Sequence, residues 1–188
     1  MQLETPRLHI RPFVLEDTPA IHRILDLCFG DGTAIDDAEA LRERESWVRW
    51  SSLSALWHER MHQPPYQDMA VVLQESGVLV GSVGYTPVLA PIEQLRHMGT
   101  PALFTAEVGL FWAIDPDHRG RGYATEAGRA LIDHAFQHLH LKRIVATTEY
   151  DNTASQQVMV KLGMRLERNP LPTPPWFQVL GMLDNPAA

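Results

Sequence analysis

Two short stretches of this 188-residue sequence carry residue types at spacings that could bind a ligand. At 58–62 the residues HERMH place two histidines one helical turn apart around a glutamate, a pattern that can hold zinc while the glutamate activates water. At 115–122 the residues DPDHRGRG join the end of an apolar stretch to the start of a helical pattern. The two stretches call for different chemistry, so we expect only one of them to be an active site.

The glycine-rich stretch has the features of an anion site. Gly120 and Gly122 stand near the first turn of the expected helix, where free backbone N–H groups and the helix dipole favour negative charge, and glycine lets a pyrophosphate approach closely. Arg119 and Arg121 add positive charge. A glycine pair also occurs in ordinary turns. Known nucleotide motifs fit less well, because the lysine of the triphosphate loop is missing and Thr125 stands where the dinucleotide motif has Gly or Ala.

The zinc interpretation of HERMH lacks two requirements. Zinc needs a third ligand and a helix that continues through both histidines, but His62 is followed by QPPY and by no further histidine at the expected spacing. We therefore expect a polar helix end and no bound metal, and keep a zinc metalloprotease only as a remote alternative. His134, His138 and His140 are typical of an exposed helix face for the same reason.

The spacing of apolar residues predicts the elements that position these stretches. Residues 106–114 are apolar at nearly every position, as in a central strand covered on both faces. A helix over 123–140, a strand over 143–149 and a helix capped by Asn152 should follow. Elsewhere we expect strands at 8–11, 69–73, 78–85, 164–167 and 176–183, helices at 17–28 (capped by Asp17) and 36–60, and a long loop at 87–104.

Length and composition predict one globular domain over 1–188, with 45% apolar residues. The net charge of −7 disfavours nucleic acid and anionic membrane surfaces as partners. No apolar run approaches the ~18 residues that cross a bilayer, and the start has no signal-peptide pattern, so we expect a cytoplasmic protein. Cys28 lies on the apolar side of a helix and is expected to be a buried, inert thiol.

The glycine-rich stretch resembles the acyl-CoA motif of the GNAT superfamily of N-acetyltransferases, [Q/R]-x-x-G-x-[G/A], at Arg119, Gly122 and Ala124. ETPRLHIRPF near the start, AEVGLFWAI at 106–114 and DNTASQQVMVKLGM at 151–164 are similar to the branch of ribosomal-protein N-terminal acetyltransferases (RimJ/RimL-like). The resemblance implies an α+β fold with α/β-type layers. The implied fold has a mixed sheet of about seven strands flanked by about four helices. Its fourth and fifth strands, here 106–114 and 143–149, splay apart to hold CoA.

By resemblance, the pyrophosphate of acetyl-CoA contacts the amides of Arg119 through Thr125, and the pantetheine arm contacts the strand end at 112–114. Asn152 and Ser155 would reach the arm or its sulfur, although ordinary helix capping explains both residues as well. The implied cofactor-binding residues are Trp112, Ala113, Ile114, Arg119, Gly120, Arg121, Gly122, Tyr123, Ala124, Thr125, Asn152 and Ser155.

Transfer of an acetyl group to an amine needs an acceptor for the amine proton. Glu107 is our candidate, because a charge in an apolar strand is costly unless it is paired or functional, and family members often carry Glu there. An ion pair with an arginine is the alternative. Met159 stands where many family members have a tyrosine that protonates the thiolate, so Ser155 or a water becomes the candidate acid.

The sequence predicts an acetyl-CoA-dependent N-acetyltransferase acting on a primary amine, in a small molecule or at a protein N-terminus. A non-catalytic acyl-CoA sensor would share the same loop and is the main alternative. The segments 30–60, 87–104 and 168–176 are unmatched to the family and are expected to select the acceptor. A monomer and a homodimer both stay open.

Overall fold

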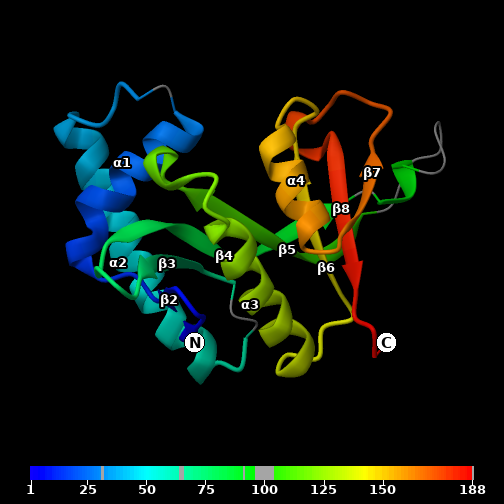
Figure 1. Cartoon of the computed structure of the whole chain (residues 1–188), viewed down its shortest axis with the longest axis horizontal. Coiled ribbons are helices and arrows are strands. Elements are labelled where there is room, and N and C mark those ends of the chain that lie inside the picture. The colour runs from blue at the N-terminus through cyan, green and yellow to red at the C-terminus, as the bar shows by residue number, and fades with distance from the viewer. Residues whose placement is uncertain (31, 64–65, 91, 96–103, 188) are drawn as a thin grey trace. The chain divides into compact units, whose positions relative to one another are not determined.

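A computed structural model describes residues 1–30, 32–63, 66–90, 92–95 and 104–187. The strands in this part are β1 (Leu3–Glu4), β2 (Leu8–Arg11), β3 (Asp68–Leu73), β4 (Leu79–Ala90), β5 (Thr105–Ile114), β6 (Arg143–Thr148), β7 (Arg165–Arg168) and β8 (Val179–Asp184). The α-helices are α1 (Thr18–Phe29), α2 (Ala38–Arg60), α3 (Tyr123–Gln137) and α4 (Thr153–Lys161) (Figure 1).

The described strands form one mixed sheet in the order β1-β2-β3-β4-β5-β6-β8-β7. β5 and β6 run parallel, whereas the pairs β1–β2, β2–β3, β3–β4, β6–β8 and β7–β8 are antiparallel. The expected α+β class with about four helices is confirmed: the described residues contain four α-helices and eight strands, where about seven strands were expected. None of the helices in the described segments is both long and apolar enough to span a bilayer.

The chain divides into two compact units, each made of separate chain segments. The first unit contains Met1–Tyr85 and Phe111–Ala130, and the second contains Thr86–Leu110 and Leu131–Ala188. β4, β5 and α3 each continue from one unit into the other along the chain.

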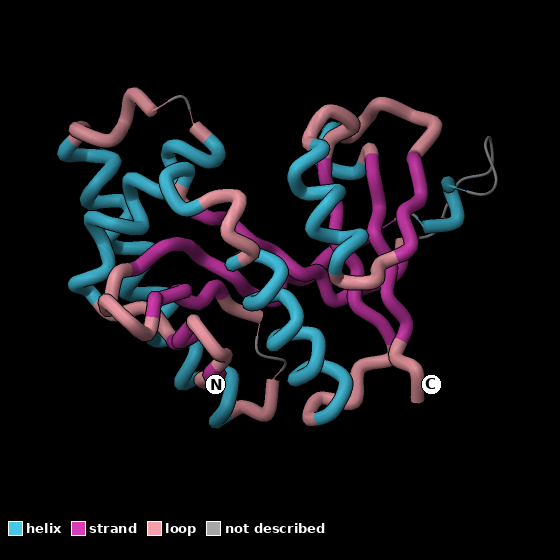
Figure 2. The backbone as a smooth tube through the Cα atoms, viewed as in Figure 1, coloured by secondary structure: helices cyan, strands magenta, loops and turns pink. Residues whose placement is uncertain are grey.

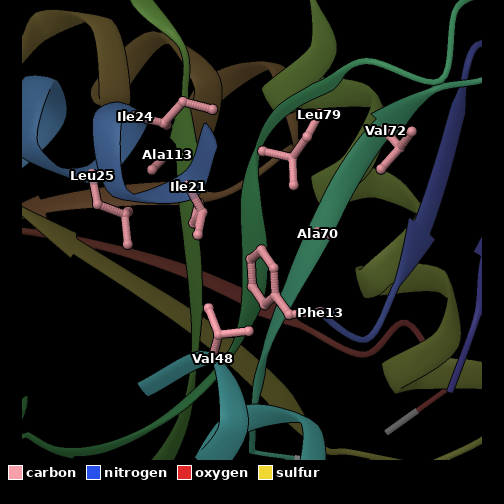
Figure 3. Packing of buried hydrophobic residues seen from close by; sticks show 9 residues of the cluster. All are labelled: Phe13, Ile21, Ile24, Leu25, Val48, Ala70, Val72, Leu79 and Ala113. Atoms are coloured by element: carbon pink, nitrogen blue, oxygen red, sulfur yellow. The ribbon is translucent and has the colours of Figure 1, made fainter. Parts of the chain in front are cut away.

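In the first unit, α1 and α2 lie beside each other and contribute to one apolar core with β3, β4 and β5 (Figure 1). Figure 3 shows the ring of Phe13 near Val48 of α2, with Ile21, Ile24 and Leu25 of α1 pointing toward the strands. Phe13 also packs on Trp47, with ring centroids 5.3 Å apart. Burial of these apolar side chains fixes the two helices on the sheet.

In the second unit, β6, β8 and β7 lie in order, with α4 beside them (Figure 2). Met159 of α4 is fully buried, and a Cβ on Gly181 of β8 would lie 3.0 Å from its sulfur. Gly109 of β5 pairs with Val145 of β6, and no second β5–β6 pair occurs within the described residues. This short pairing agrees with the expected separation of these two strands.

Three boundaries differ from the sequence expectation by three or more residues. β4 extends to Ala90, although a loop was expected from Pro87. β3 begins at Asp68 opposite Gly84, so Pro87 lies beyond the end of β3 and its missing N–H removes no ladder bond on that side. Of the rest of the expected loop, Ile92–Leu95 form a 3-10 helix, whereas residues 91 and 96–103 lie outside the described part. α3 ends at Gln137, and β8 begins at Val179 after a 3-10 turn over Pro175–Phe177.

Asp17 precedes α1 as expected, but its side chain does not cap that helix. Its carboxylate instead accepts hydrogen bonds from both terminal nitrogens of Arg11, at 2.6 and 2.9 Å, and from the Val14 amide at 2.9 Å. Asp17 therefore fixes the connection between β2 and α1.

Candidate functional site

The glycine-rich loop between β5 and α3 lies in the first unit and has a defined backbone path. It begins with the Asp115 amide donating to the Val80 carbonyl of β4 at 2.9 Å, followed by a 3-10 turn over Pro116–His118. Gly120 and Gly122 then adopt φ values of +75° and +85°. Residues with a side chain are strained in this left-handed region, so both positions favour glycine.

The loop presents a run of backbone N–H groups for which the described residues provide no acceptor. The Arg119 amide donates to the Pro116 carbonyl at 3.3 Å, and the Glu126 amide donates to the Gly122 carbonyl at 3.0 Å. Between them, the amides of 120–125 form no hydrogen bond with any other described residue. Free amides at a helix N-terminus, together with the helix dipole, suit an anion such as a pyrophosphate. The Arg119 amide, which was expected to belong to this run, is occupied by the 3-10 turn.

Helix α1 holds the start of the loop through Arg23. Its guanidinium donates to Asp115 at 2.9 Å and to Asp117 at 2.7 Å. The buried Asp115 carboxylate also accepts from the Asp117 amide at 3.1 Å. Because α1 is packed into the core, these bonds fix the loop relative to the helix.

The two arginines of the motif fold back onto the loop. Arg119 donates from Nε to the Ile114 carbonyl at 3.1 Å and from Nη2 to the Cys28 sulfur at 3.2 Å. Arg121 donates to the Asp117 carbonyl at 3.3 Å. Cys28 is half-buried and contacts Arg119, so the expectation of a buried, inert thiol is wrong on burial.

The remaining predicted cofactor residues of the first unit flank this run of amides. Ala113 and Ile114 are buried at the end of β5, and a Cβ on Gly81 of β4 would lie 2.3 Å from the Ala113 carbonyl oxygen. Trp112 is half-buried. Tyr123, Ala124 and Thr125 form the first turn of α3. The structure therefore brings residues 112–125 together as one strand–loop–helix segment.

Glu107 lies in the second unit, where it is only 8% exposed. Arg143 donates to both of its carboxylate oxygens, from Nε at 3.0 Å and from Nη2 at 2.9 Å. The alternative explanation for Glu107, an ion pair with an arginine, is thus present in the structure. A two-point pair of this kind stabilises the buried carboxylate.

Asn152 and Ser155, also in the second unit, form the N-terminal cap of α4. The Asn152 side-chain oxygen accepts from the Ser155 amide at 3.1 Å, as the capping explanation requires. The Ser155 hydroxyl makes no hydrogen bond with the rest of the described chain and is therefore available to a ligand.

The HERMH stretch does not form the helical pair that zinc needs. α2 ends at Arg60, and His62 has a φ of +52°, so His58 and His62 are not on consecutive turns of one helix. The described residues contain no group of three or more His, Cys, Asp or Glu that could hold a metal. Pro64 and Pro65, which were expected to end this helix, lie outside the described residues.

Sequence reasoning missed Thr5, Arg7 and Glu126, which pack at the start of α3. Arg7 reaches Glu126 across 119 residues of sequence, donating from its amide at 2.9 Å and from Nε at 2.7 Å. No local sequence pattern signals such a contact.

Comparison with known proteins identifies relatives. Residues 7–165 match the family model "Acetyltransferase (GNAT) domain". The uncharacterized N-acetyltransferase YnaD of Bacillus subtilis (strain 168) is 25% identical over 167 residues, covering 89% of this chain and 84% of YnaD. The ribosomal-protein-serine acetyltransferase of Escherichia coli (strain K12) is 34% identical over 107 residues, covering 57% of this chain and 52% of that protein. The structure of Mycobacterium smegmatis RimJ in complex with CoA-disulfide has the same fold, with a TM-score of 0.63 at 20% identity over 94% of this chain and 81% of that one.

Proposed function

The chain belongs to the GNAT acetyltransferase family, and from this premise we propose that it transfers the acetyl group of acetyl-CoA to a primary amine. We propose that residues 1–188 act as a single acetyltransferase domain with acetyl-CoA as co-substrate and without a metal. Because acetyl-CoA is a metabolite of the cell interior, we also propose a cytoplasmic location.

The observation that carries the proposal is the run of amides from Gly120 to Thr125, which have no hydrogen-bond acceptor among the residues that the structure describes. It combines the two positive-φ glycines with the first turn of α3, and a Cβ at Gly120 would meet no atom within 4 Å. A diphosphate can therefore approach the backbone at Gly120. The amides and the helix dipole would hold the pyrophosphate of acetyl-CoA, and the strand end at 112–114 would contact the pantetheine arm.

The bound acetyl-CoA supplies an activated thioester. In the proposed reaction the amine nitrogen attacks the thioester carbonyl carbon, the carbon–sulfur bond breaks, and CoA leaves as a thiolate. A primary alkyl amine with a pKa near ~10 is mostly protonated at neutral pH, so its proton must be removed before or during attack.

Glu107 is the proposed acceptor of that proton, directly or through a water. Arg143 donates one hydrogen bond to each of its carboxylate oxygens, and the remaining lone pairs of these oxygens can still accept a proton. Ser155 is the proposed donor to the departing sulfur, because its hydroxyl is not used in the helix cap. Asn152 is proposed to contact the pantetheine arm.

The acceptor is proposed to be a small-molecule amine or a peptide N-terminus. The Escherichia coli relative is a ribosomal-protein-serine acetyltransferase, which favours the peptide class. The main alternative, a non-catalytic acyl-CoA sensor, shares the amide run but requires no Glu107.

A screen of amine acceptors tests the proposal. Purified protein is incubated with acetyl-CoA and with peptides bearing free N-termini, amino acids, polyamines or aminoglycosides, while free thiol is followed. The proposal expects thiol release that depends on one acceptor class, together with a mass increase of one acetyl group on that acceptor. Binding of acetyl-CoA with no release for any class would favour the sensor.

A further inference from the structure

Arg7 contacts the proposed pyrophosphate loop, although the two are far apart in sequence. It lies between β1 and β2, and its guanidinium donates from Nε to Glu126 at 2.7 Å and from Nη1 to the Arg121 carbonyl at 2.9 Å. Nη2 lies 2.6 Å from the same Glu126 carboxylate. The guanidinium also stacks over the Tyr123 ring, 4.7 Å from its centroid. One side chain therefore contacts three residues of the loop and of the first turn of α3.

The turn that carries Arg7 is itself held by hydrogen bonds. The Thr5 hydroxyl accepts from the Leu8 amide at 3.0 Å and donates to Glu126 at 2.6 Å. On its other side, the Gln74 amide donates to the Arg7 carbonyl at 3.0 Å. The guanidinium is thus presented from an ordered backbone, which lowers the entropy lost in orienting it.

The bond to the Arg121 carbonyl sets the direction of the neighbouring amide. A trans peptide unit is planar, and its C=O and N–H point in opposite directions. Because the Arg121 carbonyl points at Arg7, the Gly122 N–H of the same peptide unit points away from Arg7. That N–H has no acceptor among the described residues. The hydrogen bond from Arg7 therefore directs the Gly122 N–H away from Arg7, where it can donate to a ligand.

The ion pair with Glu126 removes a negative charge from the helix start. Glu126 lies in the first turn of α3, where an unpaired carboxylate would repel a bound pyrophosphate. Burial of the Glu126 carboxyl raises its pKa, but hydrogen bonds from Thr5 and Arg7 and the charge of Arg7 outweigh burial, so the pKa lies below its usual value. Glu126 is accordingly ionised at neutral pH and is neutralised by Arg7.

We infer that Arg7 is a positioning residue for the pyrophosphate: it orients the Gly122 amide through the Arg121 carbonyl and neutralises Glu126. The inference rests on the proposed function, since it assumes that the loop receives acetyl-CoA. If Arg7 positions the loop for the pyrophosphate, only the binding of donors that carry a pyrophosphate should depend on Arg7. A purely structural role of Arg7 would affect all donors alike.

Two acetyl donors test this distinction. Acetyl-CoA contains the pyrophosphate, whereas S-acetylpantetheine has the same thioester and arm without it. For Arg7→Met, KM for acetyl-CoA should rise about 10-fold or more, as expected from losing charge-assisted hydrogen bonds, while KM for S-acetylpantetheine should stay within about 2-fold of wild type. Arg7→Lys keeps the charge but not the forked geometry, so its KM for acetyl-CoA should lie between those of wild type and Arg7→Met.

Arg165→Met is the matched control, because the exposed Arg165 forms an ion pair with Glu167 within β7, distant in sequence from the loop and outside the segments expected to select the acceptor. It should alter neither KM. An equal rise for both donors in Arg7→Met, or no rise for either in a folded variant, would overturn the inference. If Arg7→Met does not fold, the donor selectivity of Arg7→Lys decides.

Calorimetric titration with CoA separates this inference from the proposed function. A wild type that binds CoA but acetylates no amine contradicts the proposed function, while weaker CoA binding by Arg7→Met still supports the inference. A wild type that acetylates amines while Arg7→Met matches it with both donors contradicts the inference alone. A wild-type protein that binds no CoA would contradict both the proposed function and the inference about Arg7.

Discussion

Arg143 and Glu107 form a two-point ion pair in the second unit, with Nε and Nη2 of the arginine 3.0 and 2.9 Å from the two carboxylate oxygens. The pair joins β5 to β6, which run parallel. Each carboxylate oxygen already accepts a hydrogen bond from Arg143. Glu107 can therefore act as a base only through its remaining lone pairs, directly or by way of a water. Structural and chemical roles of Glu107 can be separated by mutation.

Glu107→Gln should lower kcat by ~10² or more and leave the affinity for acetyl-CoA nearly unchanged, because general bases contribute to this extent and the residue lies outside the amide run. Part of the loss should return at high pH, where the acceptor amine loses its own proton. The check is a pH–rate profile of the variant. A profile that overlays that of the wild type would remove Glu107 from the mechanism.

Arg143→Met should affect stability more than catalysis. It leaves the Glu107 carboxylate in place without its partner, so the free energy of unfolding should fall by about 1–3 kcal/mol while kcat changes by less than about 10-fold. Chemical denaturation and steady-state kinetics on the same preparation make the comparison. Loss of activity as large as in Glu107→Gln would mean that the ion pair itself is what the reaction needs.

Ser155→Ala should lower kcat by less than about 10-fold, since the CoA thiol has a pKa near that of cysteine and is already a tolerable leaving group. Its stability should change little, because the cap is made by the Asn152 side chain and the Ser155 amide, which the variant keeps. Asn152→Ala, by contrast, should lose about 1 kcal/mol. A drop in kcat of about 100-fold for Ser155→Ala would establish the hydroxyl as the acid.

Asp68, at the start of β3, should make stability depend on pH. Burial raises its pKa to about 6, against the opposing charge of Arg44. The folded state therefore binds the proton more tightly than the unfolded chain, whose Asp pKa is near ~3.9, and stability falls as pH rises from about 4 to about 6. Asp68→Asn should remove this dependence. The free energy of unfolding of the variant minus that of wild type should therefore increase by on the order of 2 kcal/mol between about pH 4.5 and about pH 7.5. A constant difference between the two proteins at all pH values would show that Asp68 titrates normally.

Much of the architecture follows from local patterns. The apolar run of β5, the stripe of α3 and the Asn152 cap predicted the strand–loop–helix segment and its neighbours, because each depends on residues close in sequence. The path of β4 past Pro87 could not be predicted, since it depends on where β3 begins. Arg7 and Glu126 were missed because the contact joins residues 119 apart.

The site shows the same division. The loop amides were predicted from the glycines, whereas the use of the Arg119 amide by Pro116 depends on the exact turn and was not. An ion pair between Glu107 and an arginine was the expected alternative. Arg143 could not be identified as that arginine from the sequence, because the pairing of β5 with β6 brings the two residues together.

Protein purified without an affinity tag should contain no stoichiometric zinc, and chelators should leave its activity unchanged. His62 lies beyond the end of α2 in a left-handed conformation, so its imidazole does not share a helical face with His58. Elemental analysis before and after dialysis against a chelator checks this. Bound zinc that disappears in His58→Ala would contradict it.

Calorimetric titration of acetyl-CoA into Gly122→Val tests the central claim, that the amides of 120–125 hold the pyrophosphate. A valine would be strained at a φ of +85°, and its Cβ would lie 3.4 Å from Arg7 Nη2, so the amides should no longer present the same geometry. Gly77→Val is the control, because Gly77 has a φ of +70°, a Cβ added there would meet no atom within 4 Å, and the residue lies in a hairpin distant in sequence. Both variants should lose comparable stability, but only Gly122→Val should lose detectable acetyl-CoA binding. Unchanged affinity in a folded Gly122→Val protein would contradict the claim and move the cofactor to another part of the chain.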